Sequence, residues 1–313
     1  MAMEKLCFGV DVGGTTIKMG LFTQQGELKE KWEIVTRKEN NGAYILDDIA
    51  ESILNKMKQN GIDKADITGI GIGVPGPVKE DGTVQNCVNL GWGIINVSQL
   101  LQEKTGFSVK AGNDANVAAL GEMWQGGGKG YKNLVMITLG TGVGGGIILD
   151  EKIVSGVNGA GGEIGHMPVV YEDTDTCGCG KKGCLEQVAS ATGIVKVTKK
   201  ILETTNEETT LKTLDNLTAK DIFDKAKKGD KVAMIAVDKL CEYLGIATAH
   251  IACVIDPEVF VIGGGVSKAG TILTENIKEK YIKKAFPACK NAKFELAKLG
   301  NDAGIYGAAK LVL

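Results

Sequence analysis

Four side chains that could bind a metal ion lie within one glycine-rich stretch of the sequence. They are one imidazole and three thiols: His166, Cys177, Cys179 and Cys184. One nitrogen and three sulfur ligands suit tetrahedral Zn²⁺ and leave no position open for water, which is typical of a structural site. The spacing therefore predicts a structural zinc that fixes the flanking carboxylates of Glu163 and Glu186. A redox thiol cluster is the alternative interpretation.

A second group with potential chemistry is Asp114, which follows Asn113 at the expected start of a helix in AGNDANVAALGE. Asp and Asn at this place commonly cap the first free N–H groups of a helix, so a structural role is one interpretation. A carboxylate that faces bound phosphates can instead take the proton of an attacking hydroxyl, as in phosphoryl transfer to alcohols. Asn113 could then orient the same substrate.

The glycines, 44 of 313 residues, gather in turns that could position these groups. Residues 6–22 and 134–154 each predict a strand, a turn of glycines and threonines, and a second strand, which suggests two halves built on one supersecondary unit. The N–H groups of such turns can converge on an anion, so two turns could hold a polyphosphate. Neither turn is a Walker loop, and the two GxGxxG matches lack the strand–turn–helix context of a dinucleotide fold.

A third glycine cluster follows a buried-strand pattern within residues 256–270, a place where open α/β sheets bind ligands. Helical periodicity predicts helices at 44–60, 113–125 and 231–252. His250 lies on the last of these, and we expect it to be a packed core residue without a ligand role. We expect buried, reduced thiols at the scattered cysteines, namely Cys7, Cys87, Cys241, Cys253 and Cys289.

The composition is that of a globular chain large enough for two domains, with 43% hydrophobic and 24% charged residues. A net charge of −2 provides no global field for nucleic acid or an anionic membrane surface, so neither is an expected partner. The N-terminal residues show neither a signal peptide nor a transmembrane span, and the expected location is the cytoplasm.

The order of the motifs resembles that of the ROK family of sugar kinases and repressors over nearly the whole chain. The matching segments are DVGGTTIK, VPGPV, NDANVAALGE, TLGTGVGGG, EIGHM, CGCGKKGCLE and IGGGVS. EIGH with the three cysteines is the specific part, because the first glycine turn alone would indicate only the wider actin, Hsp70 and hexokinase superfamily. The resemblance implies an α/β, two-domain actin-like ATPase (ribonuclease H-like) fold, with an interdomain cleft and a structural zinc loop at 163–186. It implies a small domain at 1–117, completed by a C-terminal helix at about 300–313, and a large domain at 118–299.

The resemblance further implies ATP-dependent phosphorylation of glucose at its 6-hydroxyl, with ATP, Mg²⁺ and structural Zn²⁺ as cofactors. Asp114 then looks like the catalytic base. His166 would bind zinc through one ring nitrogen and the sugar through the other. The implied sugar contacts are Gly76, Asn89, Asn113, Asp114, Glu163, His166 and Glu186. The implied nucleotide and Mg²⁺ contacts are Asp11, Gly13, Gly14, Thr15, Thr16, Lys18, Gly140, Thr141, Gly142, Gly144, Gly264 and Gly265.

Alternatives stay open at this point. Kinases for N-acetylmannosamine, N-acetylglucosamine, allose or fructose share most of these motifs. A sugar-responsive regulator belongs to a different class; the repressors carry a helix-turn-helix ahead of the kinase-like core, whereas the first phosphate turn begins here at Asp11, so an enzyme is favoured. A sugar-binding module without turnover is disfavoured by Asp114. The resemblance suggests a homo-oligomer, either a dimer or a tetramer.

Overall fold

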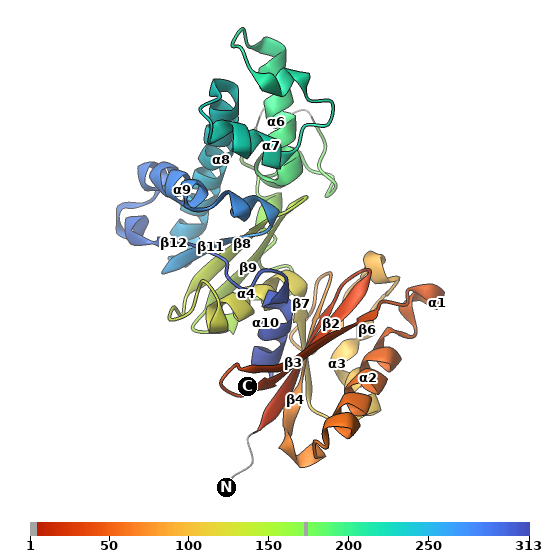
Figure 1. Cartoon of the computed structure of the whole chain (residues 1–313). Helices are drawn as coiled ribbons and strands as arrows, with labels where there is room; N and C mark the ends of the chain where they lie inside the picture. Colours follow the sequence, from red (N-terminus) through yellow and green to blue (C-terminus); the bar gives the residue numbers. More distant parts are fainter. Residues whose placement is uncertain (1–4, 172–174) are drawn as a thin grey trace. The chain divides into compact units, whose positions relative to one another are not determined.

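The computed structural model describes residues 5–171 and 175–313, which form two compact units (Figure 1). Unit 1 holds the described residues up to 132 together with 146–162 and 298–313. Unit 2 holds 133–145 and the described part of 163–297. The predicted domains, 1–117 with 300–313 and 118–299, have other bounds and stay a prediction.

Unit 1 is built on a five-stranded sheet of order β3-β2-β1-β4-β7. Its strands are β1 Leu6–Val12, β2 Thr16–Thr23, β3 Leu28–Val35, β4 Ile67–Val74 and β7 Val109–Asn113. The first three pair antiparallel, whereas β1, β4 and β7 are parallel. The carboxyl ends of the parallel strands therefore meet at one edge, where β1 leads into the first glycine turn and β7 leads into a helix.

Helices cover both faces of this sheet (Figure 1). The helices α2 Ile45–Asn60 and α3 Val97–Thr105 lie on one face, and α10 Ala303–Leu311 contacts β1 and β4 on the other. The apolar side chains of α2 recur every three or four residues and enter the core that contains the β1 and β4 side chains. Two further helices are α1 Glu39–Gly42 and α4 Asp114–Gln125. The short strands β5 Thr83–Val84 and β6 Ile95–Asn96 form a separate antiparallel pair.

The helix α10 approaches the sheet so closely that only glycine fits beneath it. A Cβ atom on Gly9 would lie 2.0 Å from the carbonyl oxygen of Ile305, and one on Gly71 would lie 1.6 Å from that of Ala308. On the helix itself, a Cβ atom on Gly307 would lie 1.7 Å from the carbonyl oxygen of Val117 in α4. Glycines from three elements thus place the C-terminal helix against β1, β4 and α4.

The second sheet repeats the plan of the first, with order β10-β9-β8-β11-β12. Its strands are β8 Leu134–Leu139, β9 Val143–Leu149, β10 Lys152–Ile153, β11 Val259–Gly263 and β12 Lys293–Leu296. As in the first sheet, the two strands at one side, β10 and β9, pair antiparallel, whereas β8, β11 and β12 are parallel. The predicted strand–turn–strand repeat is confirmed, with the second glycine turn after β8 and the third glycine cluster after β11.

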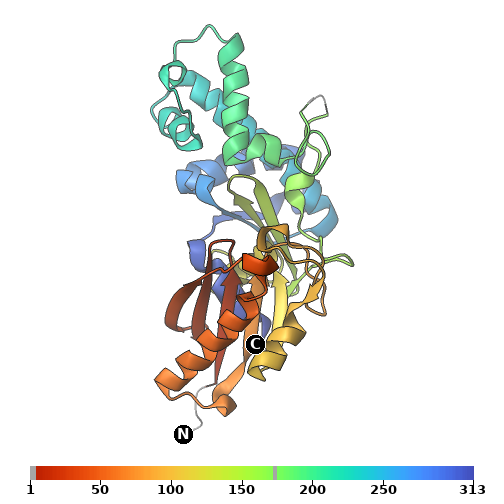
Figure 2. The ribbon, with the colours of Figure 1, turned by 90° about the vertical axis from the view of Figure 1, so that its right-hand side faces the viewer.

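Unit 2 adds a group of helices to these strands. They are α5 Glu186–Ala189, α6 Ala191–Thr204, α7 Ala219–Ala226, α8 Lys231–Ile255 and α9 Thr271–Lys284. Figure 2 shows α6 and α7 extending beyond the strands, where they pack on α8. The predicted helices at 44–60, 113–125 and 231–252 are confirmed as α2, α4 and α8.

Two expectations about α8 are wrong. His250 and Cys253 are exposed, although both were expected to be buried. They lie three residues apart on one helix face, while Ala249, Ile251 and Ala252 between and before them are buried. The other scattered cysteines are free and buried as predicted: Cys7, Cys87, Cys241 and Cys289.

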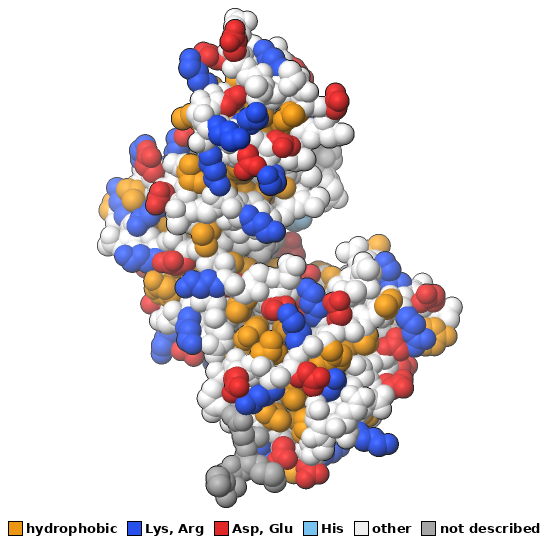
Figure 3. All heavy atoms as spheres, viewed as in Figure 1, with side chains coloured by type: hydrophobic (Ala, Val, Ile, Leu, Met, Phe, Trp, Pro, Cys, Tyr) orange, Lys and Arg blue, Asp and Glu red, His pale blue; other side chains and the backbone are white. Residues whose placement is uncertain are grey.

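The surface of unit 2 carries lysines and carboxylates interspersed (Figure 3). Exposed i, i+4 pairs such as Lys220–Asp224 and Lys283–Glu279 contribute little to stability, because water and salt screen their charges. Stability therefore comes mainly from the buried apolar side chains. Of the helices that the structure describes, none has the length and apolar character needed to span a bilayer.

Candidate functional site

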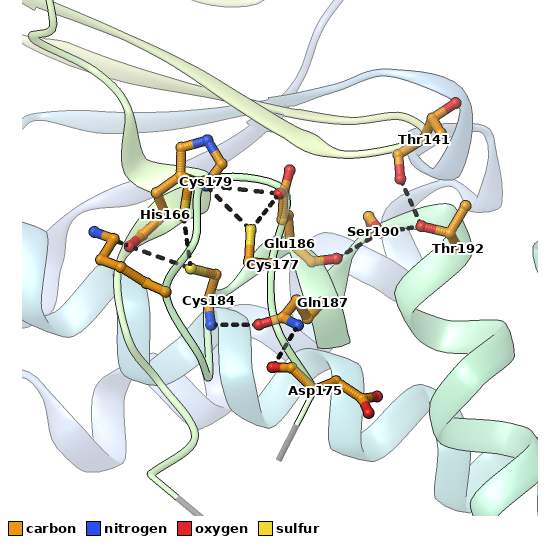
Figure 4. Close-up of polar contacts among 11 residues, drawn as sticks. Thr141, His166, Asp175, Cys177, Cys179, Cys184, Glu186, Gln187, Ser190 and Thr192 are labelled. Carbon is orange, nitrogen blue, oxygen red and sulfur yellow. Dashed lines mark hydrogen bonds and ion pairs between the residues drawn. The ribbon is translucent and has the colours of Figure 1, made fainter. Parts of the chain in front are cut away.

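The four predicted metal ligands come together in unit 2 (Figure 4). Their ligand atoms all lie within 4.8 Å of one another. The Sγ of Cys177 is 3.6 Å from Nδ1 of His166, and the Sγ of Cys179 is 3.6 Å from that of Cys184. Zinc–sulfur bonds of about 2.3 Å in a tetrahedron place the sulfur atoms about 3.8 Å apart, so this cluster has the dimensions of a zinc site.

The loop that carries the cysteines is folded by its own backbone. The N–H of Cys177 donates to the carbonyl of Lys181 at 2.7 Å, and Pro168 pairs with Cys184 in an isolated bridge. Gly183 has a φ of +73°, and a Cβ atom there would lie 1.7 Å from the carbonyl oxygen of Val170. Glycine is therefore required at this position to bring Cys184 back to His166.

The thiols differ in their affinity for protons. Burial raises the pKa of Cys177 to about 12 and also raises the pKa of Cys184. The backbone N–H of Lys181 lowers the pKa of Cys179. Two of the three thiols therefore keep their protons at neutral pH unless a cation displaces them, as Zn²⁺ does when it binds thiolates.

Glu186 joins this cluster to the second glycine turn. Its Oε1 accepts a hydrogen bond from the Sγ of Cys177 at 2.9 Å and lies 3.6 Å from Nδ1 of His166. A Cβ atom on Gly142 would lie 2.6 Å from Oε2 of Glu186. The structure therefore brings the predicted sugar contacts His166 and Glu186 together beside the turn. Glu163 is exposed and directly precedes the short turn Ile164–His166.

The second and third glycine clusters meet at the carboxyl ends of β8 and β11, because Thr138 and Gly263 are partners in adjacent parallel strands. Gly264 has a φ of +82°, and a Cβ atom there would lie 2.5 Å from the carbonyl oxygen of Leu139. A Cβ atom on Gly265 would meet nothing within 4 Å. Gly264 thus closes the end of the strands, while the space beside Gly265 is open.

In unit 1, the first glycine turn lies beside two carboxylates. The N–H of Gly13 donates to the carbonyl of Thr16 at 3.0 Å, so this N–H is already paired within the turn. Burial and the negative charge of Asp114 raise the pKa of Asp11 to about 6, against the opposing charge of Lys18. The carboxylates of Asp11 and Asp114 are therefore close enough to repel each other, an arrangement that suits a hard divalent cation.

Asn113 is the cap of helix α4, and this frees its neighbour from that role. The Oδ1 of Asn113 accepts hydrogen bonds from the N–H groups of Ala115 and Asn116 at 3.0 and 3.2 Å. Its Nδ2 donates to the carbonyl of Gly76 at 3.0 Å, which ties two predicted sugar contacts together. Asp114 stands at the first helical position, where its Oδ1 accepts from the N–H of Ala115 at 2.8 Å.

The remaining predicted sugar contact, Asn89, is exposed in the turn Val88–Leu90. Among the described residues, no hydrogen bond joins it to another predicted contact. Trp92 behind it is buried, and its Nε1 donates to the carbonyl of Gly42 at 3.1 Å. The aromatic ring therefore supports this turn from the core and presents Asn89 on the surface.

Sequence reasoning missed Glu122, a fully buried carboxylate on α4. Its oxygens accept hydrogen bonds from three backbone N–H groups: Gly127 at 2.7 Å, Lys298 at 2.9 Å and Leu299 at 2.8 Å. Glu122 thus fastens the segment that enters α10 to the helix that carries Asp114. The one signal in the sequence was a charged residue within an apolar helical pattern. Such a pattern indicates a buried charge but does not say which groups pair with it.

Comparisons with known proteins agree with this geometry. A sequence model of the ROK family matches residues 7–313. A glucokinase from Halalkalibacterium halodurans is 47% identical over 309 residues, which cover 97% of this chain and 94% of that protein. A glucokinase from Thermotoga maritima is 36% identical over 317 residues, covering 99% and 98%. The solved structure of a ROK family glucokinase from Streptomyces griseus, in complex with glucose and AMPPNP, matches with a TM-score of 0.74 and 33% identity, covering 98% of each chain. The predicted α/β actin-like fold class is confirmed.

Proposed function

We propose that this chain, which belongs to the ROK family, is a glucokinase that transfers the terminal phosphoryl group of ATP to the 6-hydroxyl of glucose. The observation that carries the proposal is the end of β7, where Asn113 takes the capping role and Asp114 stands beside Asp11 and the first glycine turn. A kinase needs a group near the bound phosphates that accepts the proton of the attacking hydroxyl, and Asp114 would supply it.

In the proposed reaction the 6-hydroxyl oxygen attacks the terminal phosphorus of ATP, and the bond from that phosphorus to the bridging oxygen of ADP breaks. Asp114 accepts the proton of the hydroxyl. Asn113 and Gly76, which are hydrogen-bonded to each other, bind sugar hydroxyls together with Asn89, Glu163, His166 and Glu186. A site that pairs every sugar hydroxyl discriminates between hexoses, because a missing hydroxyl leaves buried polar groups unpaired at about 1–3 kcal/mol each.

The nucleotide is proposed to lie against backbone N–H groups of the glycine turns. Gly14 and Thr15 of the first turn, with Thr16 and Lys18, face the transferred phosphate. The second turn holds the remaining phosphates, and Gly264 and Gly265 approach the adenosine; the contacts in the second turn are Gly140, Thr141, Gly142 and Gly144. Asp11 would hold Mg²⁺, which neutralises charge on the phosphates when bound.

A structural Zn²⁺ is proposed at the cluster of His166 with the three cysteines, whose spacing fits the ion. We expect about one zinc per purified chain, and chelation should lower the thermal midpoint. Cys179→Ser should lose the metal, whereas Cys253→Ser, at an exposed cysteine of α8, should keep it. Full zinc content in Cys179→Ser would contradict the assignment.

A homo-oligomer and a cytoplasmic location also stay predictions.

The function is tested by measuring ADP release over a panel of hexoses, with ATP or polyphosphate as the phosphoryl donor. We expect the highest kcat/KM with glucose and ATP. The panel includes N-acetylmannosamine, N-acetylglucosamine, allose and fructose. A higher kcat/KM for one of these sugars would replace glucose as the substrate, and no turnover with any sugar or donor would overturn the proposal.

A further inference from the structure

We propose that Thr192, with Ser190, positions the second glycine turn for the nucleotide, so that the N-terminus of α6 sets the affinity for ATP. The inference rests on the proposed function, because it assumes that this turn holds phosphates. It concerns residues outside the predicted sugar and nucleotide contacts. Neither side chain is proposed to touch the substrate.

The N-terminus of α6 binds two successive carbonyl groups of the turn, and Figure 4 shows the bond that Thr192 makes. The Oγ1 of Thr192 donates to the carbonyl of Thr141 at 2.7 Å. The N–H of Ala191 donates to the carbonyl of Gly140 at 2.8 Å. The two bonds come from the first two residues of the helix and fix two neighbouring peptide groups of the turn.

This fixation determines where the amide hydrogens point. In a trans peptide the C=O and the following N–H lie on opposite sides of the bond. With the carbonyls of Gly140 and Thr141 turned toward α6, the N–H groups of Thr141 and Gly142 are turned away from it. Neither N–H donates to another backbone group among the described residues. Two successive amides that point the same way form a concave anion site, which is what a phosphate requires.

Ser190 fixes the first turn of α6, which carries Thr192. It is fully buried and is the cap of α6: its Oγ accepts from the N–H of Gly193 at 2.9 Å and donates to the carbonyl of Glu186 at 2.7 Å. The Oγ atoms of Ser190 and Thr192 lie 3.0 Å apart. Since Glu186 also contacts Cys177, the segment 186–192 connects the metal cluster to the glycine turn.

The inference is tested with Thr192→Val, which removes the hydroxyl at nearly constant volume, and with Thr192→Ser, which retains it. Thr198→Val is the matched control. Thr198 lies on the same helix and makes a bond of the same length, 2.7 Å, but to the carbonyl of Ile194 within α6. Binding of a non-hydrolysable ATP analogue with Mg²⁺ is measured by calorimetry without sugar, and urea midpoints establish that all variants are folded.

We expect the dissociation constant of the analogue to rise about tenfold in Thr192→Val, which corresponds to 1.4 kcal/mol and to one lost hydrogen bond. It should stay within about twofold of wild type in Thr192→Ser and Thr198→Val. KM for ATP should follow, while kcat and KM for the sugar change less than about threefold.

Unchanged affinity in Thr192→Val would overturn the inference, and so would an equal loss in Thr198→Val. The proposed function fails in a different way, since it requires that the wild-type chain phosphorylate glucose. A wild-type chain that binds the analogue but turns over no sugar would remove the function and leave the role of Thr192 in nucleotide binding intact.

Discussion

The two glycine turns have the same place in two similar sheets, yet their surroundings differ. The first turn lies beside charged side chains, Asp11 and Lys18, with Asp114 near enough to raise the pKa of Asp11. The second turn is held by neutral donors, the hydroxyl of Thr192 and the N–H of Ala191. Each turn is closed by a hydrogen bond from its own first glycine.

The difference shows how a duplicated unit can take on two tasks. In the proposed site, the repeated strand–turn–strand backbone provides the amides that would bind an anion in each half, because such amides converge at the end of the strand. The side chains around the turn then determine what else happens there. Acidic groups in unit 1 can accept a proton and hold a divalent cation. In unit 2 the neutral donors of α6 fix the backbone of the second turn, and the carboxylate beside that turn, Glu186, accepts a hydrogen bond from Cys177.

Replacing the carboxylate that distinguishes unit 1 should have the largest effect. In Asp114→Asn we expect kcat to fall about 10³-fold or more, because the proton acceptor is lost, while sugar and nucleotide affinities stay within about tenfold. Steady-state kinetics and calorimetry measure the two quantities. Asp81→Asn is the control, since Asp81 is an exposed carboxylate of unit 1 that accepts from the N–H of Thr83. Near-normal kcat in Asp114→Asn would remove the catalytic difference between the two turns.

Backbone constraint at the third glycine cluster, which meets the second turn at the ends of β8 and β11, is tested by two neighbouring glycines. Gly264→Ala should lower the free energy of unfolding by about 3 kcal/mol, because it combines an unfavourable φ with a clash against Leu139. Gly265→Ala should change it by less than about 1 kcal/mol, since open space surrounds that position. Urea unfolding measures both. Equal stability of the two variants would mean that the positive φ and the close contact of Gly264 do not constrain the backbone conformation at this place.

The anchoring of α10 in unit 1 is tested at Glu122. Glu122→Gln replaces an acceptor oxygen with a donor that faces backbone N–H groups, and we expect a loss of about 2 kcal/mol in the free energy of unfolding. Glu103→Gln, which affects an exposed acceptor of Gln99, should cost less than about 0.5 kcal/mol. A Glu122→Gln variant as stable as Glu103→Gln would show that the glycine contacts alone hold α10.

The charge at the first turn should make the stability of the chain depend on pH. Because the pKa of Asp11 rises from 3.8 to about 6 on folding, the folded chain binds this proton more tightly than the unfolded one. Without nucleotide or Mg²⁺, the contribution of Asp11 to stability should therefore fall as the pH rises from about 4 to about 7, by at most about 3 kcal/mol. Unfolding free energies of wild type and Asp11→Asn across this range should diverge accordingly. Parallel curves would contradict a raised pKa.

Local pattern was enough to predict several elements of this fold. The repeat at residues 6–22 and 134–154 was visible because an apolar strand, a turn of glycines and threonines, and a second strand recur in the same order in both segments. The cluster of His166 with three cysteines was visible because few other functions need those ligands together. In both cases the information lies within a short segment.

The burial of α8 was not predictable in the same way. Apolar residues surround this helix on most sides, so its sequence does not reveal which narrow face meets solvent. His250 and Cys253 lie on that face and stay exposed. Which face is covered depends on where the neighbouring helices pack, and the sequence of α8 does not contain this information. The role of Asn113 was similarly ambiguous, because Asn113 and Asp114 are both good capping residues.

The sequence by itself determined the family, through the order of its motifs along the chain. It also determined the two glycine turns, the candidate metal ligands and Asp114 as the candidate proton acceptor, since each of these depends on residue types at short spacing. The tertiary structure decided that Asn113 and not Asp114 caps α4, that Glu122 fastens the entry to α10, and that Thr192 binds the second turn. These contacts join segments from different parts of the chain, and their partners are selected by packing and by the need to pair every buried polar group. Short-range pattern specifies the groups, and folding over long sequence distances specifies what each of them contacts.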